Sequence, residues 1–178
     1  AIIAQNRGVQ SVLVDVDPQK SAETWGKIRG AMPPTVVATI VPSLPRTLDA
    51  LRKQGVELVV IDTSPRANRE AIEVANQANL VILPVRPSIL DINATNETLY
   101  LLRDISAPKV AVLNAVPSRT TEASEAAEVL SQMKIELVAQ LGDRTDYRRA
   151  LSTGRGITEY APNSKAAREI ISLYDELV

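Results

Sequence analysis

Short apolar runs alternate with longer amphipathic stretches along nearly the whole chain, and this alternation most constrains the fold. The runs are rich in Val, Ile and Leu, which favours buried strands, whereas the stretches repeat apolar residues at helical spacing. Apolar strands joined by helices are typical of a mostly parallel, twisted sheet with helices on both faces. We therefore expect a three-layer α/β (αβα) fold in one domain over residues 1–178. The expected strands are 11–17, 35–41, 58–63, 79–85, 109–115 and 135–141, and the expected helices lie at about 21–29, 44–54, 67–78, 90–105, 121–133, 144–153 and 164–177.

The composition narrows the chemistry, because the sequence has no Cys and no His. Disulfides, thiol nucleophiles, Cys/His zinc sites and Ser-His-Asp triads are excluded, which leaves carboxylates, Lys, Arg, hydroxyls, amides and a hard cation. The formal net charge of −1 means that any affinity for nucleic acid needs a local basic patch. The longest apolar runs fall far short of the roughly 20 residues that span a bilayer. We therefore expect a cytoplasmic protein without a membrane partner.

Polar side chains and prolines follow the apolar runs at the same end each time. In open α/β sheets, ligands bind at the carboxyl ends of the strands, so these residues are the candidate site. The segments are Asp15–Gln19, Asp62–Pro65, Pro84–Ser88 and Asn114–Ser118.

Asp62 ends an apolar strand, LVVID, in the Walker B arrangement. In that arrangement the aspartate reaches a nucleotide-bound Mg²⁺ directly or through water. An aspartate at this position can instead cap the next helix, and the strand alone does not decide between the two roles.

Asp15 and Asp17 form a pair of acids at the end of an earlier strand. Strand alternation places both on one face, where two carboxylates repel each other unless a cation or polar partners lie beside them. The alternative is one helix cap and one solvated residue.

Five segments follow one another in the order of the motifs of a known family. They are VLVDVDPQKSAETW, LVVIDTSP, LVILPVRPSILD, AVLNAVPSRT and GRGITEYAPNSKAAREIISLYDEL. This pattern resembles the ParA-type ATPases of the deviant-Walker MinD/ParA superfamily, over nearly the whole chain. The closest likeness is to the small plasmid-partition type, and the implied fold is P-loop NTPase-like.

The resemblance also implies roles for the site residues. Asp17 matches the carboxylate that positions the attacking water, and Asp15 and Asp62 match the groups behind Mg²⁺, bound through water. The remaining matches imply contacts with ATP or ADP: the adenine pocket at Asn114, Val116 and Pro117, and a loop near the nucleotide and the self-association surface at Pro84 and Pro87.

The family's cycle implies the partners. ATP binding joins two protomers, the homodimer binds DNA without sequence specificity, and a centromere-binding or cargo-adaptor protein stimulates hydrolysis. This cycle partitions plasmids or chromosomes, which implies association with the nucleoid.

One family motif, the phosphate-binding loop Lys-Gly-Gly-x-Gly-Lys-Thr, does not occur in this sequence. The opening residues AIIAQNRG resemble the end of a helix and its glycine stop. We expect the first strand and the P-loop to be missing from the front, and the 178-residue chain alone to be at best a very poor ATPase.

Basic residues gather in the C-terminal part and form the candidate DNA-binding patch. Arg144 and Arg148 are spaced for one helix face. A solvated face, neutralised in part by nearby acids, is the alternative. The candidates are Arg119, Arg144, Arg148, Arg149 and Lys165, with Arg155 and Arg168 nearby.

Other functions remain open at this stage. An ATPase that positions a non-DNA cargo differs from a partition ATPase chiefly in its partner. A non-catalytic interaction module without the P-loop is the third possibility. Trp25, the sole tryptophan, is expected to be a packing residue.

Overall fold

A computed structural model describes residues 1–65, 68–118 and 121–178, and the chain divides into two compact units. Unit 1 consists of Ala1–Arg66 and Asp146–Pro162, and unit 2 consists of Ala67–Thr145 and Asn163–Val178. The expectation of one domain over residues 1–178 stays a prediction.

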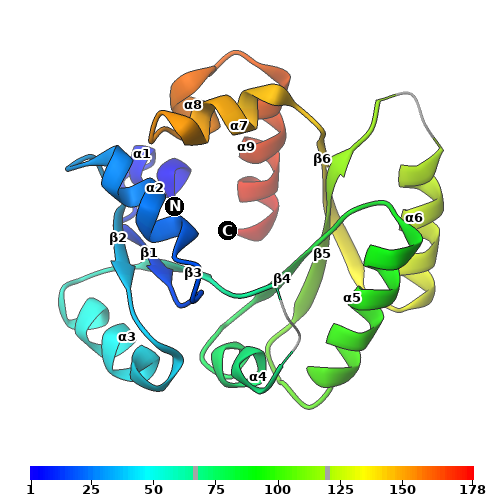
Figure 1. The fold of residues 1–178 in the computed structure, drawn as a ribbon, viewed down its shortest axis with the longest axis horizontal. Coiled ribbons are helices and arrows are strands. Elements are labelled where there is room, and N and C mark those ends of the chain that lie inside the picture. Colours follow the sequence, from blue (N-terminus) through cyan, green and yellow to red (C-terminus); the bar gives the residue numbers. More distant parts are fainter. Residues whose placement is uncertain (66–67, 119–120) are drawn as a thin grey trace. The chain divides into compact units, whose positions relative to one another are not determined.

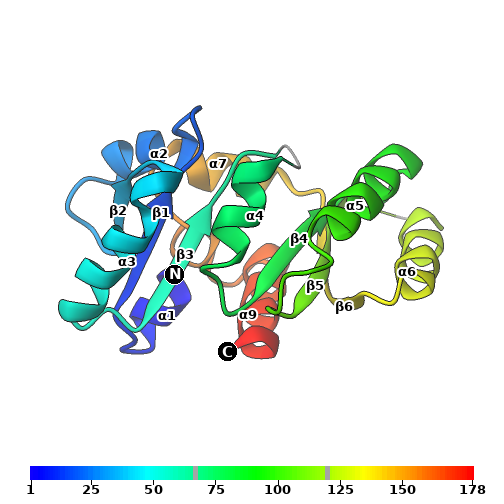
Figure 2. The same cartoon turned by 90° about the horizontal axis from the view of Figure 1, so that it is seen from below.

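The sheet of unit 1 has three parallel strands in the order β2-β1-β3 (Figure 2). Its central strand β1 (Ser11–Asp15) pairs with β2 (Thr35–Ala38) on one side and β3 (Leu58–Asp62) on the other. Val12 and Val14 of β1 are buried in the core. All three carboxyl ends lie at the same edge of the sheet because the strands are parallel.

Short helices surround this sheet. They are α1 (Ile2–Asn6), α2 (Ser21–Arg29), α3 (Leu44–Lys53), preceded by a 3-10 turn at Val41–Ser43, α7 (Thr145–Ser152) and α8 (Ile157–Tyr160). Helices α1 and α2 pack against β1, and α2 also packs against β2. The chain leaves α1 through Gly8, whose φ of +83° favours glycine, so the expected helix end with a glycine stop is confirmed.

Unit 2 contains a second parallel sheet in the order β4-β5-β6. Its strands are β4 (Val81–Val85), β5 (Lys109–Val116) and β6 (Glu136–Gly142), and its helices are α4 (Arg69–Ala75), α5 (Ile89–Leu101), α6 (Glu122–Gln132) and α9 (Lys165–Leu177). Figure 1 shows α5 and α6 on one face of β5 and β6 and α9 on the other. The core between β5 and α6 is aliphatic, with Leu113 and Leu130 fully buried.

Side-chain caps begin three of the helices in unit 2. Asn68, Ser88 and Ser164 each accept a hydrogen bond from the third residue of the helix that follows. Ser164 is thus the residue that caps the start of α9.

The two parallel, helix-flanked sheets confirm the predicted α/β class, and all six expected strands form. Two boundaries differ in ways that matter for the site. The first strand ends at Asp15 instead of 17, because a turn with Pro18 at its second position begins at Asp17. Helix α7 begins at Thr145, so Arg144 lies outside it.

In the part of the chain that the structure describes, every helix is too short or too polar to cross a membrane.

Candidate functional site

Three carboxylates, called here the acidic cluster, lie at the carboxyl ends of the strands of unit 1: Asp15, Asp17 and Asp62. Asp15 and Asp62 are direct neighbours in the register of β1 and β3, and the next backbone amide, that of Val16, donates to the Asp62 carbonyl at 3.0 Å. Asp17 follows in the turn after β1. The structure therefore brings together the three acids that the sequence singled out in this half of the chain.

Asp15 holds the local backbone with both carboxylate oxygens. It is 1% exposed, its Oδ1 accepts from the Asp17 amide at 2.9 Å, and its Oδ2 accepts from the Glu23 amide at 2.8 Å. Glu23 is the third residue of α2, so Asp15 satisfies a donor that the helix start would otherwise leave unpaired. Asp15 thus sets both the turn after β1 and the start of α2.

Asp17 begins a tight turn. Its Oδ1 accepts from the Gln19 amide and its carbonyl accepts from the Lys20 amide, each at 2.9 Å. Pro18 supplies the fixed φ at the second position of this turn. Because β1 ends at Asp15, the alternation argument that put both acids on one strand face does not apply to Asp17.

Burial raises the pKa of Asp62, and the negative charges of Asp15 and Asp17 raise it further, although a hydrogen bond from the Thr63 amide lowers it. The three acids therefore interact electrostatically and carry excess negative charge at the strand ends. A cation that arrives from outside the cluster would relieve this repulsion.

The donor set fits Mg²⁺ that arrives with a nucleotide. Among residues 1–65, 68–118 and 121–178, no group of three or more acidic side chains could hold a metal ion by itself. Mg²⁺ at nucleotide sites takes one or two carboxylates and completes its octahedron with phosphates and waters. Asp15 and Asp62 lie side by side at the strand ends and carry excess negative charge, which meets that requirement.

The predicted adenine-pocket residues lie in unit 2, at the end of β5. The register between β5 and β6 shifts between Leu113 and Val116, which marks a β-bulge. Within the bulge Asn114 is exposed, its Oδ1 accepts from the Ala115 amide at 2.9 Å, and Ala115 has a φ of +53°. Bulges re-aim side chains near binding sites, which fits a binding role for this strand end. Pro117 follows and is exposed.

The predicted loop with Pro84 and Pro87 also lies in unit 2. Pro84 is part of β4, the edge strand of its sheet, where a missing backbone N–H is tolerated. Pro87 precedes Ser88, whose Oγ donates to the Asp91 carboxylate and accepts from the Asp91 amide at the start of α5. The loop is thereby held in place by the cap of α5.

The basic candidates lie in different surroundings. Nε of Arg144 donates to Oε2 of Glu169 at 3.0 Å, and the Gly142 amide donates to the same oxygen at 3.2 Å. Arg144 therefore joins the end of β6 to α9 within unit 2. Arg148 and Arg149 are exposed on α7, and Lys165 is exposed at the start of α9. Arg119 lies outside the described residues.

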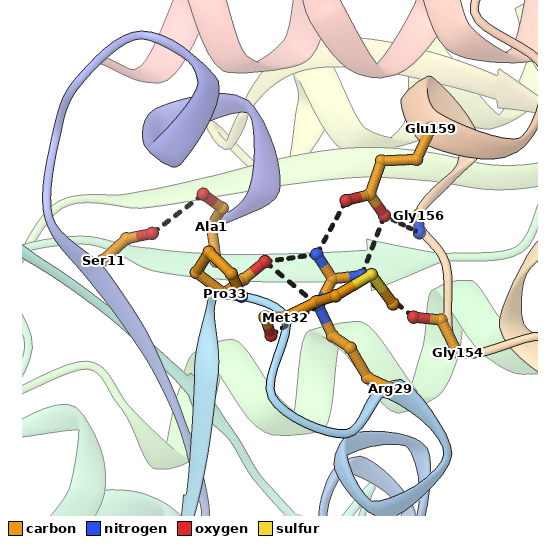
Figure 3. Close-up of polar contacts among 8 residues, drawn as sticks. All are labelled: Ala1, Ser11, Arg29, Met32, Pro33, Gly154, Gly156 and Glu159. Carbon is orange, nitrogen blue, oxygen red and sulfur yellow. Dashed lines mark hydrogen bonds and ion pairs between the residues drawn. The ribbon is translucent and has the colours of Figure 1, made fainter.

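One feature of unit 1 was missed in the sequence. Arg29, in the last turn of α2, forms an ion pair with Glu159 and is almost fully buried (Figure 3). A basic residue at a helix end is ordinary, and the partner lies 130 residues away, so no local pattern marks this pair.

Comparison with known proteins gives relatives in sequence and in structure. The protein ParA of Rhizobium radiobacter is 26% identical over 101 residues, a match that covers 56% of this chain and 45% of that protein. The chain thus spans less than half the length of the curated relative that it matches. No family model matches the chain.

Two solved structures show the same fold over nearly the whole chain. The septum site-determining protein MinD of Pyrococcus horikoshii OT3, complexed with Mg-ADP, has a TM-score of 0.75 at 18% identity and covers 97% of this chain and 84% of its own. A ParA family ATPase from Chlorobium tepidum TLS has a TM-score of 0.72 at 12% identity and covers 99% and 88%. The sequence match to ParA and the fold shared with these two structures therefore confirm the resemblance drawn from the five motifs.

Proposed function

We propose that this chain is the core of a Mg²⁺-dependent, ParA-like ATPase that partitions DNA. The observation that supports this most directly is the register of Asp15 beside Asp62 at the carboxyl ends of two parallel strands. Ligands of α/β sheets bind at this edge, and the carboxylates there carry charge that a nucleotide-bound cation would offset. The sequence match to ParA and the fold shared with a Mg-ADP complex of MinD agree with this function.

In this proposal the three acids of unit 1 have different roles. Asp62, whose pKa is raised by burial and by the two neighbouring acids, faces the cation, which offsets its negative charge. Asp15 lies beside it in the strand register and holds the turn and the start of α2. Asp17, at the half-buried turn, orients the water that attacks the γ-phosphate. Mg²⁺ bound near Asp62 would supply charge neutralisation for the phosphates.

In this proposal, the residues of unit 2 that match the family's adenine pocket contact the base. The bulge at Asn114 presents an exposed amide, which can both donate and accept hydrogen bonds, as an adenine edge requires. Val116 and Pro117 offer apolar surface for the ring, and the loop of Pro84 and Pro87 lies at the start of α5.

Non-specific DNA binding is proposed for the exposed arginines of α7. Arg148 and Arg149 lie on this helix, Arg155 follows it and Lys165 begins α9, and all four side chains are exposed. Such residues neutralise phosphates without contacting the bases. Because the net charge of the chain is near zero, DNA affinity would have to come from a local group of this kind. ATP-dependent dimerisation and a hydrolysis-stimulating adaptor complete the proposed cycle.

The test is calorimetric titration of the full gene product with ADP, with and without Mg²⁺. In Asp62→Asn we expect Mg²⁺-dependent affinity to fall by roughly 10–100-fold, the usual loss when a group that supports a metal is removed. In Asp17→Asn we expect nucleotide to bind while ATP turnover falls by about 100-fold or more.

The matched control is Asp49→Asn on α3, which removes an exposed carboxylate that pairs with exposed Arg52. We expect wild-type nucleotide affinity in this variant. A full gene product that binds ADP equally well with and without Mg²⁺, or an Asp62→Asn variant with unchanged affinity, would refute the proposed site.

The DNA-binding part is tested by the salt dependence of binding to duplexes of different sequence. Arg148→Ala with Arg149→Ala should weaken binding equally on all sequences and reduce the salt slope by about 1 for each phosphate that is no longer neutralised. Arg52→Ala, an exposed arginine on α3, is the control. An unchanged slope in the double variant would place the DNA site elsewhere.

A further inference from the structure

The guanidinium of Arg29 fastens the end of α2 to the segment that follows α7 (Figure 3). Its side chain is 2% exposed, and all five of its N–H groups donate hydrogen bonds. Nη1 and Nη2 reach the two carboxylate oxygens of Glu159 at 2.8 and 2.7 Å, and Nη1 also reaches the Gly154 carbonyl at 2.9 Å. Nε is shared between the carbonyls of Met32 and Pro33 at 3.1 Å each, and Nη2 also donates to the Pro33 carbonyl. Such a bidentate, charge-assisted pair is among the stronger polar contacts in proteins.

The surroundings of this pair leave little room for rearrangement. Gly154 has a φ of +69°, and a Cβ there would lie 2.6 Å from the Arg29 backbone nitrogen, so two backbones meet directly. The Trp25 ring lies 5.0 Å from the guanidinium carbon. Glu159 Oε2 also accepts from the Gly156 amide at 2.8 Å, and its hydrogen bonds, that from Arg29 first, lower the pKa of Glu159.

The other end of α2 is fastened to the acidic cluster. Oδ2 of Asp15 accepts from the Glu23 amide in the first turn of the helix. The nine residues of α2 are about 13 Å long at the usual rise per residue. Helix α2 is thus hydrogen-bonded at its start to the strand ends and at its end to the turn between α7 and α8. All of these segments belong to unit 1.

We propose that Arg29 is a positioning residue that couples the acidic cluster to the α7–α8 segment through α2. A change at Asp15 that shifts the start of α2 also shifts its end, because the hydrogen-bonded turns of a short helix move together as one rigid body. Arg29 passes this shift to Gly154 and Glu159. Without the ion pair, a shift of α2 no longer reaches the α7–α8 segment.

The functional consequence rests on the proposed function above. Arg149 lies on α7, and the Arg155 amide donates to the Ala150 carbonyl at the end of that helix, so the exposed arginines belong to the segment that Arg29 holds. Nucleotide at the acidic cluster would thereby change how these arginines are presented to a phosphate backbone. The ion pair would then be the link that makes DNA affinity depend on nucleotide.

The coupling itself is tested without nucleotide or DNA, by native-state hydrogen exchange of the full gene product. Wild type, Asp15→Asn, Glu159→Gln and the double variant form a cycle, read at the Tyr160 amide, which donates to the Gly156 carbonyl. We expect Asp15→Asn to accelerate exchange about tenfold in the wild-type background and less than about twofold in Glu159→Gln, since coupled sites are non-additive. Equal acceleration in both backgrounds would overturn the proposal.

Two further variants test whether the coupling depends specifically on Arg29. Arg29→Lys keeps the charge but loses the planar fork of donors, so it should uncouple α2 from the α7–α8 segment as Glu159→Gln does. Asp49→Asn, which breaks the exposed pair on α3, should leave the effect of Asp15→Asn unchanged. Full coupling in Arg29→Lys, or loss of coupling in Asp49→Asn, would refute a specific role for Arg29.

A second measurement separates this proposal from the proposed function. We expect the ratio of DNA affinities with and without Mg·ATP to fall toward one in Glu159→Gln, while nucleotide affinity stays within about twofold of wild type. A wild-type ratio retained in Glu159→Gln would overturn the functional role of Arg29. A wild-type protein that binds neither nucleotide nor DNA would instead refute the proposed function, and the exchange cycle would still decide the coupling.

Discussion

Gly154→Ala is the sharpest test of how α2 meets the turn after α7. Gly154 is buried and has a φ of +69°, where a side chain costs about 1–2 kcal/mol. The added Cβ would also lie 2.6 Å from the Arg29 nitrogen and 2.8 Å from its Cα, and backbone atoms cannot turn aside as a side chain can. Overpacking of this kind costs about 1–3 kcal/mol. The free energy of unfolding should therefore fall by about 2–5 kcal/mol in total.

The assay is urea denaturation followed by tryptophan fluorescence. Trp25 is the sole tryptophan and lies in unit 1, so its signal reports the unit that contains the contact. Gly8→Ala is the matched control, because Gly8 has a φ of +83° and no atom within 4 Å of its added Cβ. The control should lose only the backbone part, about 1–2 kcal/mol. If Gly154→Ala costs no more than Gly8→Ala, the close contact between α2 and the turn does not exist in solution.

Three further predictions concern single side chains in the two units. Folding raises the pKa of Asp62, so the ionised carboxylate destabilises the folded state above the folded-state pKa, whereas below the unfolded-state pKa the group is protonated in both states and has no such effect. Asp62→Asn should therefore stabilise unit 1 at neutral pH, and this gain should be lost below about pH 3. Denaturation at each pH measures the effect. Leu130→Ala empties a fully buried position in the core of unit 2 and should cost about 2–5 kcal/mol, measured by urea denaturation followed by circular dichroism. Arg144→Ala leaves the Glu169 carboxylate without its arginine and should cost about 1–2 kcal/mol in the same assay, whereas exposed Arg149→Ala should change stability by less than about 0.5 kcal/mol.

The strands were predictable because their signal is local. A buried parallel strand needs a short run of β-branched and aliphatic residues, and each of the six runs formed a strand. Segment ends were less predictable where a side chain competes with the ladder. The Asp17 carboxylate accepts a hydrogen bond from the Gln19 amide, and the turn that this bond stabilises ends β1 early. The pattern of hydrophobic residues along the sequence carries no information on such a bond.

Contacts between segments that are distant in the chain could not be predicted from sequence patterns. Arg29 and Glu159 each look like ordinary charged residues of short helices, and only the fold brings them to 2.7 Å. Arg144 was predicted to share a helix face with Arg148, but α7 begins after it and its guanidinium pairs with Glu169 on α9. In both pairs the partner is set by tertiary packing, which period and motif do not encode.

The acidic cluster shows why finding the right residues did not assign their roles. The motif correctly placed Asp15 and Asp62 together, yet it treated them as equivalent groups behind a cation. Asp15 accepts one backbone amide on each carboxylate oxygen, so replacing it disturbs the turn and α2 whether or not a ligand is bound. Asp62 instead has its ionised form opposed by burial and by its neighbours. Because loss of a satisfied acceptor destabilises the fold and loss of an opposed charge stabilises it, the stability of the ligand-free protein should fall in Asp15→Asn and rise in Asp62→Asn, and this opposite sign separates the structural acid from the one poised for a cation.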